Sequence, residues 1–134
     1  MSDPLSPVLT EAERKALDRK WDCKLGCPVE LTLEVIGGRW KGVIMYHLTK
    51  GTLRFGQLKR LIPGITQRML TLQLRELEAD GLVDRTVYPE VPPRVEYALS
   101  DVGRTLQPII HAMLEWGIEH QDYVYGLRGR STAS

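Results

Sequence analysis

The sequence predicts a mainly α-helical fold that carries one small β-hairpin. Apolar residues recur at the spacing of helices through most of the 134 residues. Pro63-Gly64 breaks this pattern between two short helical segments, and after Gly81 the composition changes to the β-branched and aromatic residues of strands. The length suits a single domain, and an apolar content of 43% suits a buried core.

Capping residues and helix breakers define the expected helices. Thr10 and Glu13 have the spacing of a capping box at the start of the first helix. Pro28 suits the first position of the second helix, which places Cys27 at its N-cap, and Pro108 is expected to kink or restart the last helical region. Helices are therefore predicted over residues 10–21, 28–36, 39–49, 55–62, 66–80 and 101–125.

The segment after Gly81 is predicted to form a two-stranded hairpin. Residues 82–88 and 95–99 have strand composition, and a proline-rich tip that ends at Arg94 joins them. Two helices with a tight turn between them form a helix-turn-helix unit, and the hairpin over 83–99 is its wing. The expected parts are an N-terminal arm and helix (1–26), a winged helix-turn-helix domain (27–100), a C-terminal helix (101–126) and a disordered tail (127–134).

Charge is strongly segregated along the chain. No acidic residue lies between Glu34 and Glu76, whereas eight basic residues do. The whole chain holds 18 basic and 17 acidic residues, so the remainder carries 10 basic residues against 17 acidic ones. The net charge of +1 therefore combines a segment of +8 with a remainder of −7. Such a surface is expected to meet a polyanion, although a basic face that binds only solvent has the same composition.

The helix over 66–80 is expected to present an apolar stripe and an opposite polar face. Leu70, Leu74 and Leu77 share the stripe, whereas Arg68 and Leu72 lie on the opposite side. A leucine on an outer face is best explained by an apolar partner outside the domain, such as a thymine methyl group. The outer face therefore has the composition of a surface that reads DNA.

A second helix of this kind enters the major groove, where its first residues reach the base edges. Arg68 suits guanine, Gln67 suits adenine, and Thr71 suits bases or phosphate. Other basic side chains are expected to bind phosphates, and Arg94 the adjacent minor groove or its backbone. The predicted DNA-contacting residues are Thr66, Gln67, Arg68, Thr71, Leu72, Arg75, Arg54, Lys59, Arg60 and Arg94.

The last helical region is apolar over more than one face, which is typical of a helix that packs on another chain. A homodimer is therefore expected, with contributions from the arm over 1–26. The predicted interface residues are Leu106, Ile109, Ile110, Met113 and Trp116.

Two further groups of residues suggest chemistry. Cys27 at a helix N-terminus faces the positive end of the helix dipole, which favours the reactive thiolate, and Cys23 is a conceivable disulfide partner. The bland interpretation of Cys27 is a small capping residue. His111, Glu115 and Glu119 recur at metal-ligand spacing, but this pattern is more typical of a solvated helix face, so no metal or cofactor is predicted.

These segments resemble the HxlR family of bacterial winged-helix transcriptional regulators. The similarity covers roughly residues 27–120 and is carried by Cys27-Pro28-Val29, by Gly37-Gly38-Arg39-Trp40-Lys41, by residues 53–58, 65–71 and 74–78, and by the wing string over 88–97. The resemblance implies a homodimer that binds an inverted repeat near a promoter, as a repressor or an activator. It also implies, for some members, sensing of oxidants or electrophiles through a cysteine placed like Cys27, whereas Cys23 is outside the common pattern.

The sequence therefore predicts a dimeric, sequence-specific DNA-binding regulator of transcription, most simply a repressor, and not an enzyme. A winged-helix module that binds only proteins is the alternative. A thiol oxidoreductase is disfavoured, because Cys23 and Cys27 do not have Cys-x-x-Cys spacing. No apolar run approaches the roughly 18 residues of a membrane span, and no secretion signal is visible, so the cytoplasm is the expected compartment.

Overall fold

The computed structural model describes residues 9–18 and 26–132, and it divides into two compact units, residues 1–34 and 35–134. In the first unit, α1 spans Glu11–Asp18. The Thr10 N–H donates to Glu13 Oε2 at 2.8 Å, and the Glu13 N–H donates to Thr10 Oγ1 at 3.1 Å, which confirms the capping box. The predicted extension of this helix to residue 21 lies outside the described residues.

Helix α2 spans Pro28–Ile36 and crosses from the first unit into the second. It begins at Pro28 as predicted, and the carbonyl of Cys27 accepts the Glu30 N–H at 2.8 Å. Its last residue, Ile36, is buried.

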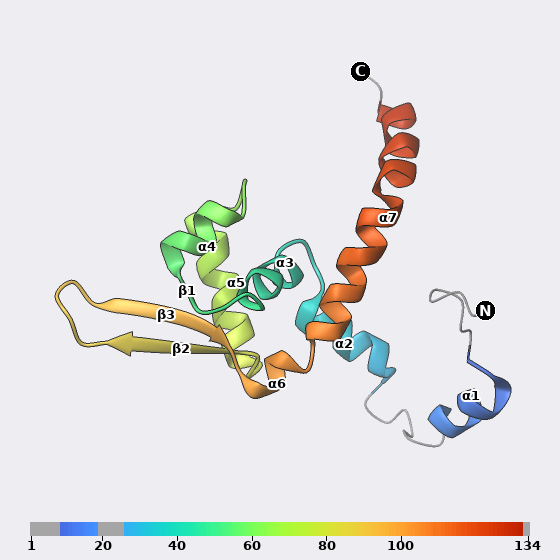
Figure 1. The fold of residues 1–134 in the computed structure, drawn as a ribbon, viewed down its shortest axis with the longest axis horizontal. Coiled ribbons are helices and arrows are strands. Elements are labelled where there is room, and N and C mark those ends of the chain that lie inside the picture. The colour runs from blue at the N-terminus through green and yellow to red at the C-terminus, as the bar shows by residue number, and fades with distance from the viewer. Residues whose placement is uncertain (1–8, 19–25, 133–134) are drawn as a thin grey trace. The chain divides into compact units, whose positions relative to one another are not determined.

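The second unit contains four longer helices, one short helix and a small sheet (Figure 1). The predicted mainly α-helical fold with a hairpin wing is confirmed. The elements are α3 (Lys41–Leu48), β1 (Leu53–Arg54), α4 (Phe55–Leu61), α5 (Gln67–Ala79), β2 (Val83–Tyr88), β3 (Arg94–Leu99), α6 (Asp101–Arg104) and α7 (Gln107–Thr132). Of these, α2 also contributes its last residues to this unit.

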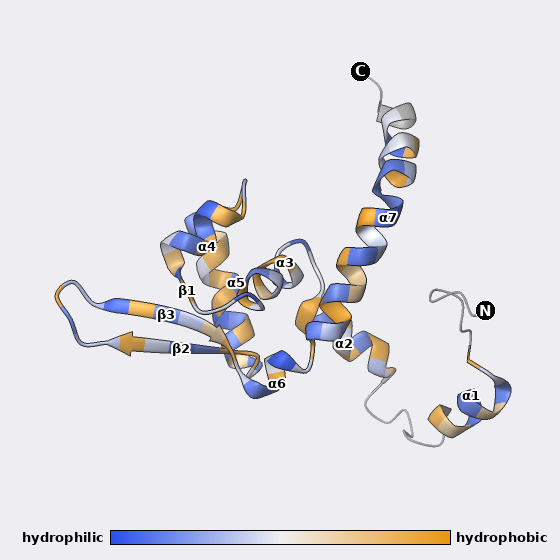
Figure 2. Ribbon diagram, in the orientation of Figure 1, coloured by the Kyte–Doolittle hydropathy of each residue, from blue (hydrophilic) through white to orange (hydrophobic). Residues whose placement is uncertain are grey.

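The core lies where α3, α4 and α5 meet the root of the sheet and the start of α7. Ile44 and Met45 of α3 and Leu58 of α4 are fully buried. Figure 2 shows the apolar residues of α4 and α5 turned toward α3, with hydrophilic residues on the outer sides. Val43, which the sequence places inward, is instead 39% exposed, because α3 turns Ile44, Met45 and Leu48 into the core.

The sheet has three antiparallel strands in the order β1-β3-β2, one more than the sequence predicts. Leu53 of β1 pairs with Tyr97 of β3, and along the hairpin Val83 pairs with Leu99 and Tyr88 with Arg94. Two residues are too short to show strand periodicity, so β1 exists only through its pairing with β3. This pairing ties the wing to the segment that leads into α4.

Helix α7 begins at Gln107 after the short α6, so Pro108 lies at a restart of the helix. The helix continues through Thr132, which corrects the prediction of a disordered tail from residue 127. Leu127 and Arg128 are good helix formers, and propagation of an existing helix costs less than nucleation. None of the helices in residues 9–18 and 26–132 is long and apolar enough to cross a membrane.

The predicted dimer surface of α7 is corrected at its first turns. Ile110 is only 2% exposed and Leu106 packs against the same core, because the start of α7 lies on α3. Ile109, Met113 and Trp116 are 43%, 45% and 51% exposed. The apolar residues of this helix therefore divide between the domain's own core and an outer surface.

A close contact joins the end of the wing to the helices that follow it. Ser100 Oγ accepts the Gly103 N–H at 2.9 Å and donates to the carbonyl of Gly81 at 2.6 Å. This arrangement brings Gly103 against the backbone at Leu82, and a Cβ atom on Gly103 would lie 2.1 Å from the Leu82 carbonyl oxygen. Only glycine fits there without moving α6 from the sheet.

Substitution of Gly103 by alanine is expected to destabilise the protein by about 3 kcal/mol or more, since the clash is with backbone that cannot rotate away. Gly126→Ala in α7 is the control, because nothing lies within 4 Å of a Cβ there and alanine favours a helix by about 0.5–1 kcal/mol. Chemical denaturation measures both changes. Equal stability of the two variants would contradict the assigned close contact.

Candidate nucleic-acid interface

Helix α5 has one buried and one exposed face, as its sequence predicts. Leu70, Leu74 and Leu77 are 0%, 1% and 0% exposed and face the core. Leu72 on the opposite face is 46% exposed although the helix is well packed. The buried stripe therefore fixes which residues of α5 point outward.

The N-terminus of α5 is held by its cap. Thr66 has an extended backbone, and its Oγ1 accepts the Met69 N–H at 3.0 Å. This bond places Gln67 and Arg68 in the first turn, both exposed. At the other end Gly81 adopts a φ of 74°, a left-handed conformation that stops the helix where the wing begins.

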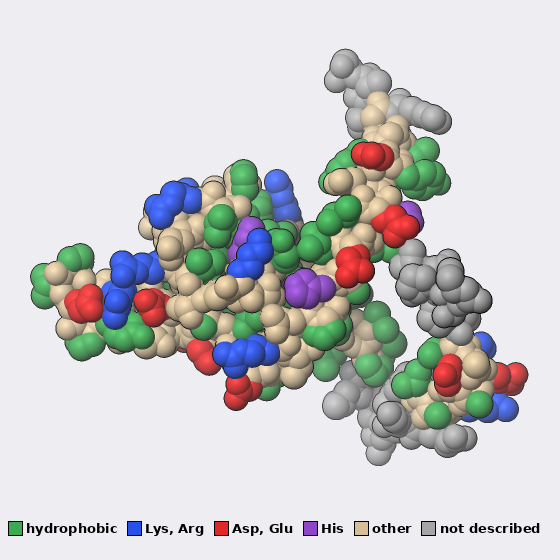
Figure 3. Space-filling model, in the orientation of Figure 1, with side chains coloured by type: hydrophobic (Ala, Val, Ile, Leu, Met, Phe, Trp, Pro, Cys, Tyr) green, Lys and Arg blue, Asp and Glu red, His purple; other side chains and the backbone are tan. Residues whose placement is uncertain are grey.

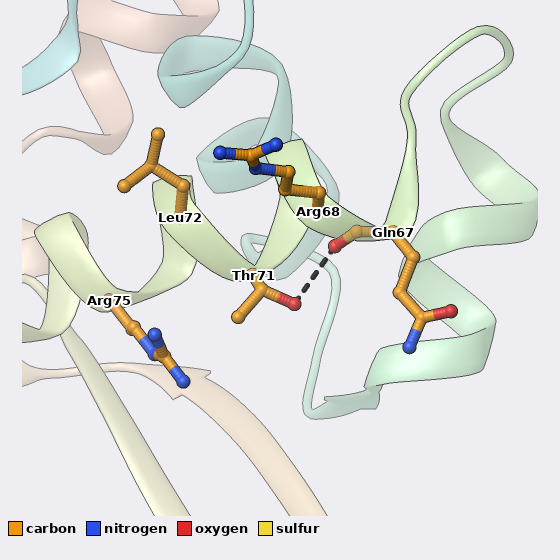
Figure 4. Close-up of a pocket in the computed structure, with 5 residues that line it drawn as sticks. All are labelled: Gln67, Arg68, Thr71, Leu72 and Arg75. Carbon is orange, nitrogen blue, oxygen red and sulfur yellow. Dashed lines mark hydrogen bonds between the residues drawn. The ribbon is translucent and has the colours of Figure 1, made fainter.

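Five outward residues of α5 line an open surface hollow of about 530 Å³. Figure 4 shows their side chains projecting from this single helix, with Thr71 between Arg68 and Arg75. Two cationic groups, an amide, a hydroxyl and a leucine thus share one face. The lining residues are Gln67, Arg68, Thr71, Leu72 and Arg75.

The hydroxyl of Thr71 already has one partner. Its Oγ1 donates to the Gln67 carbonyl of the preceding turn at 2.8 Å, the dashed line in Figure 4. The proton is therefore engaged inside the helix, and the oxygen offers lone pairs outward. An external partner of Thr71 is thus expected to be a donor, such as the amino group of adenine or cytosine.

Five of the eight basic residues between Glu34 and Glu76 make no ion pair with any described residue of the chain (9–18 and 26–132). All five are exposed, and Figure 3 shows Lys and Arg side chains over the end of the molecule that carries α4. Their charges face solvent, as those of a phosphate-binding surface must. They are Arg54, Lys59, Arg60, Arg68 and Arg75.

The other three basic residues have internal partners that the sequence does not reveal. Lys41 Nζ lies 2.6 Å from Glu76 Oε1, and only 14% of the lysine side chain is exposed, so this pair joins α3 to α5. The guanidinium of Arg39 lies 4.4 Å from the ring centroid of Trp40, and Lys50 Nζ lies 4.6 Å from that of Tyr46.

Arg94 at the end of the wing tip differs from the other predicted DNA-contacting residues. Its guanidinium lies near the carboxylates of Glu90 and Glu96 and over the ring of Tyr88. The sequence analysis missed these partners, although Glu96 shares a strand face with Arg94 two residues away. Contact of Arg94 with DNA requires these pairs to open.

Tyr97 marks the place where the sheet meets α5. Burial raises the pKa of Tyr97 above its usual 10.0, while the nearby positive charges of Arg85 and Arg75 act in the opposite direction. The ion pair of Arg85 Nε with Glu78 Oε1, at 3.6 Å, also joins β2 to α5. The wing is therefore attached to the helix that carries the outward face.

Cys27 is a free, exposed thiol at the start of α2, and Cys23 lies outside the described residues. Within the described residues, no three His, Cys, Asp or Glu side chains are grouped so as to hold a metal ion. His120 instead stacks on Trp116 with ring centroids 4.4 Å apart.

Comparison with known proteins identifies the family. The family model described as HxlR-like helix-turn-helix matches residues 35–125. The HTH-type transcriptional regulator YybR of Bacillus subtilis (strain 168) is 59% identical over 105 residues, covering 78% of this chain and 84% of YybR.

Solved structures of the redox regulator HypR are also similar. The reduced form has 58% sequence identity and a TM-score of 0.72, and covers 75% of this chain and 99% of that one. The oxidized form has 62% identity and a TM-score of 0.68, and covers 69% of this chain and 96% of that one. With more than half of its length matched by the family model, and with the helix-turn-helix and wing in place, the chain belongs to the HxlR family of winged helix-turn-helix transcriptional regulators.

Proposed function

We propose that the protein is a homodimeric, sequence-specific DNA-binding repressor of transcription that recognises an inverted repeat. The observation that carries this proposal is the outer face of α5, where Arg68, Thr71 and Leu72 stand exposed around one surface hollow. Hydrogen-bonding groups beside an apolar side chain match the floor of the major groove, which presents acceptors, donors and thymine methyl groups. The role is that of a binding protein rather than an enzyme.

Each outward residue of α5 has an assigned part in this proposal. Arg68 reads guanine through two hydrogen bonds, and Gln67 reads adenine. Thr71 accepts from an exocyclic amino group, because its own proton is engaged with the Gln67 carbonyl. Leu72 packs on a thymine methyl group, and Arg75 lies farther along the helix, where it meets the backbone.

Phosphate contacts supply the affinity. Arg54, Lys59 and Arg60 are exposed and have no ion-pair partner among the described residues, so they bind without first breaking an internal contact. Neutralisation of phosphates releases counterions and makes the affinity depend on salt. These residues are expected to act alike on every DNA sequence.

The homodimer forms, in this proposal, through the outer surface of α7. Met113, Trp116 and Ile118 are 45%, 51% and 61% exposed, and they belong to an open hollow of about 520 Å³ that Val43 of α3 completes. Exposed apolar side chains over several turns of one helix are typical of an interface. A two-fold dimer presents its two α5 helices to half-sites about one DNA turn apart, which makes the operator an inverted repeat. Occupation of such a site in a promoter blocks transcription.

We further propose that oxidation of Cys27 regulates DNA binding. Cys27 is exposed and not in a disulfide, and α2 connects it directly to Ile36 in the core of the second unit. Similarity to HypR, a redox regulator whose reduced and oxidized forms are known, supports this assignment. Diamide oxidises two thiols to one disulfide and takes up their two protons and two electrons, so Cys27 needs a second thiol, either Cys23 or the second subunit's Cys27.

The test of DNA recognition is selection of random duplexes by the purified protein, followed by affinity measurements on the enriched sequence. Arg68→Ala should cost about 1–3 kcal/mol at one base pair and relax the preference there. Lys59→Ala should weaken all duplexes alike and lower the slope of log affinity against log salt by about one. Enrichment of no sequence, or equal sequence-blind losses in both variants, would contradict the proposal.

Trp116→Asp should convert the dimer into a monomer, because a carboxylate in the centre of an apolar interface loses its hydration. Sedimentation equilibrium over a range of concentrations measures the change. The control is Val102→Asp, which alters a side chain of α6 that is 60% exposed and lies outside the proposed interface. A dimer that survives Trp116→Asp as well as the control does would rule out the outer face of α7.

Diamide is expected to change the operator affinity of the wild type and to leave Cys27→Ser unaffected. Cys23→Ser separates the two possible disulfides: a lost response indicates a Cys23–Cys27 pair, and a retained response indicates a pair between subunits. Non-reducing electrophoresis distinguishes the products by mass. An unchanged response in Cys27→Ser would exclude Cys27 as the sensor.

A further inference from the structure

The wing does not present its arginine outward. Arg94 Nη2 lies 3.4 Å from Glu90 Oε1, Arg94 Nε lies 3.8 Å from Glu96 Oε2, and the guanidinium carbon lies 4.0 Å from the ring centroid of Tyr88. Only 30% of the arginine side chain is exposed. Two carboxylates and an aromatic ring therefore already occupy the charge that the wing would offer to a phosphate.

The wing as a whole has the opposite charge from the rest of the predicted DNA-binding surface. Residues 83–99 contain Arg85 and Arg94 against Asp84, Glu90 and Glu96, a net charge of −1. Attraction to phosphates therefore does not explain how the tip of the wing would approach a duplex.

The tip itself is apolar and protruding. The side chain of Val91 is fully exposed (102%), and each residue from Pro89 to Pro93 is exposed. Figure 3 shows the hydrophobic side chains gathered at the far end of the wing, beyond a cluster of charged side chains. Prolines fix the backbone here, and the Arg94–Glu90 contact spans the turn, so Val91 is displayed on a stiff support.

The length of the wing fits the spacing of DNA grooves. Strand β2 has six residues, or about 20 Å at roughly 3.3 Å per residue. Half a turn of B-DNA, the step from a major groove to the next minor groove, is about 17 Å. Because the Arg85–Glu78 pair attaches β2 to α5, a duplex with its major groove on α5 brings the neighbouring minor groove to the wing tip.

We propose that the wing contacts the minor groove through its apolar tip, with Val91 as the contact residue and Arg94 as a positioning residue. Minor-groove proteins use apolar side chains against sugars and base steps in this way. In this arrangement Arg94 keeps its partners Glu90, Glu96 and Tyr88 in the complex and holds the turn that displays Val91. The inference rests on the proposed DNA-binding function and adds a second, uncharged contact to it.

The test compares Val91→Asn with Val102→Asn on the selected operator. Both substitutions replace an exposed valine by a polar side chain, but only the first lies on the wing. Val91→Asn is expected to weaken binding about tenfold with an unchanged salt slope, since no phosphate contact is lost, and Val102→Asn less than twofold. Hydroxyl-radical footprinting should show loss of the outer minor-groove protection in Val91→Asn alone.

Arg94→Gln distinguishes positioning from direct contact. A positioning arginine predicts weaker binding with the wild-type salt slope, and a double variant with Val91→Asn that binds no more weakly than the single variants. A direct phosphate contact predicts a slope lower by about one and additive losses, which would overturn the assignment.

The outcomes separate the two proposals. Specific binding by the wild type that Arg68→Ala weakens, together with equal affinities of Val91→Asn and Val102→Asn, would disprove the wing contact and leave the regulator assignment intact. Absence of any preferred duplex for the wild type would remove both. Protection of the outer minor groove that persists in Val91→Asn would likewise contradict the inference.

Discussion

The packing of Leu70, Leu74 and Leu77 into the core is the constraint on which the rest of the structure depends. These three side chains fix the rotation of α5, and with it the direction of every side chain on the opposite face. The Lys41–Glu76 ion pair adds a polar contact that holds α5 on α3. Reading of a groove tolerates little error in position, so the specificity of the outer face originates in the apolar one.

Local signals in the sequence account for most of this arrangement. The cap at Thr66, the leucine stripe and Gly81 each act within one or two turns of helix, and for that reason α5 was predictable almost to the residue. The wing was predictable in the same way from its composition and its prolines. The outward residues of α5 then follow from helix geometry alone.

Contacts between distant segments account for what could not be predicted. Strand β1 is two residues long and depends on β3, more than forty positions later in the sequence. Leu106 and Ile110 have the same apolar character as Met113 and Trp116, and only the position of α3 decides which of them are buried. The partners of Lys41 and Arg94 likewise depend on how the elements pack, so no residue count could reveal which positive charges remain exposed.

The exposed cations of the proposed DNA-binding face carry a cost for the free protein. Arg54, Lys59, Arg60, Arg68 and Arg75 have no opposite charge beside them in the described part of the chain, so in the absence of a polyanion they repel one another. Salt relieves this repulsion and favours the folded domain, although the same salt competes with DNA for the surface. The face best suited to function is therefore a source of strain in the unbound state, and the leucine core beneath it must be stable enough to bear that self-repulsion.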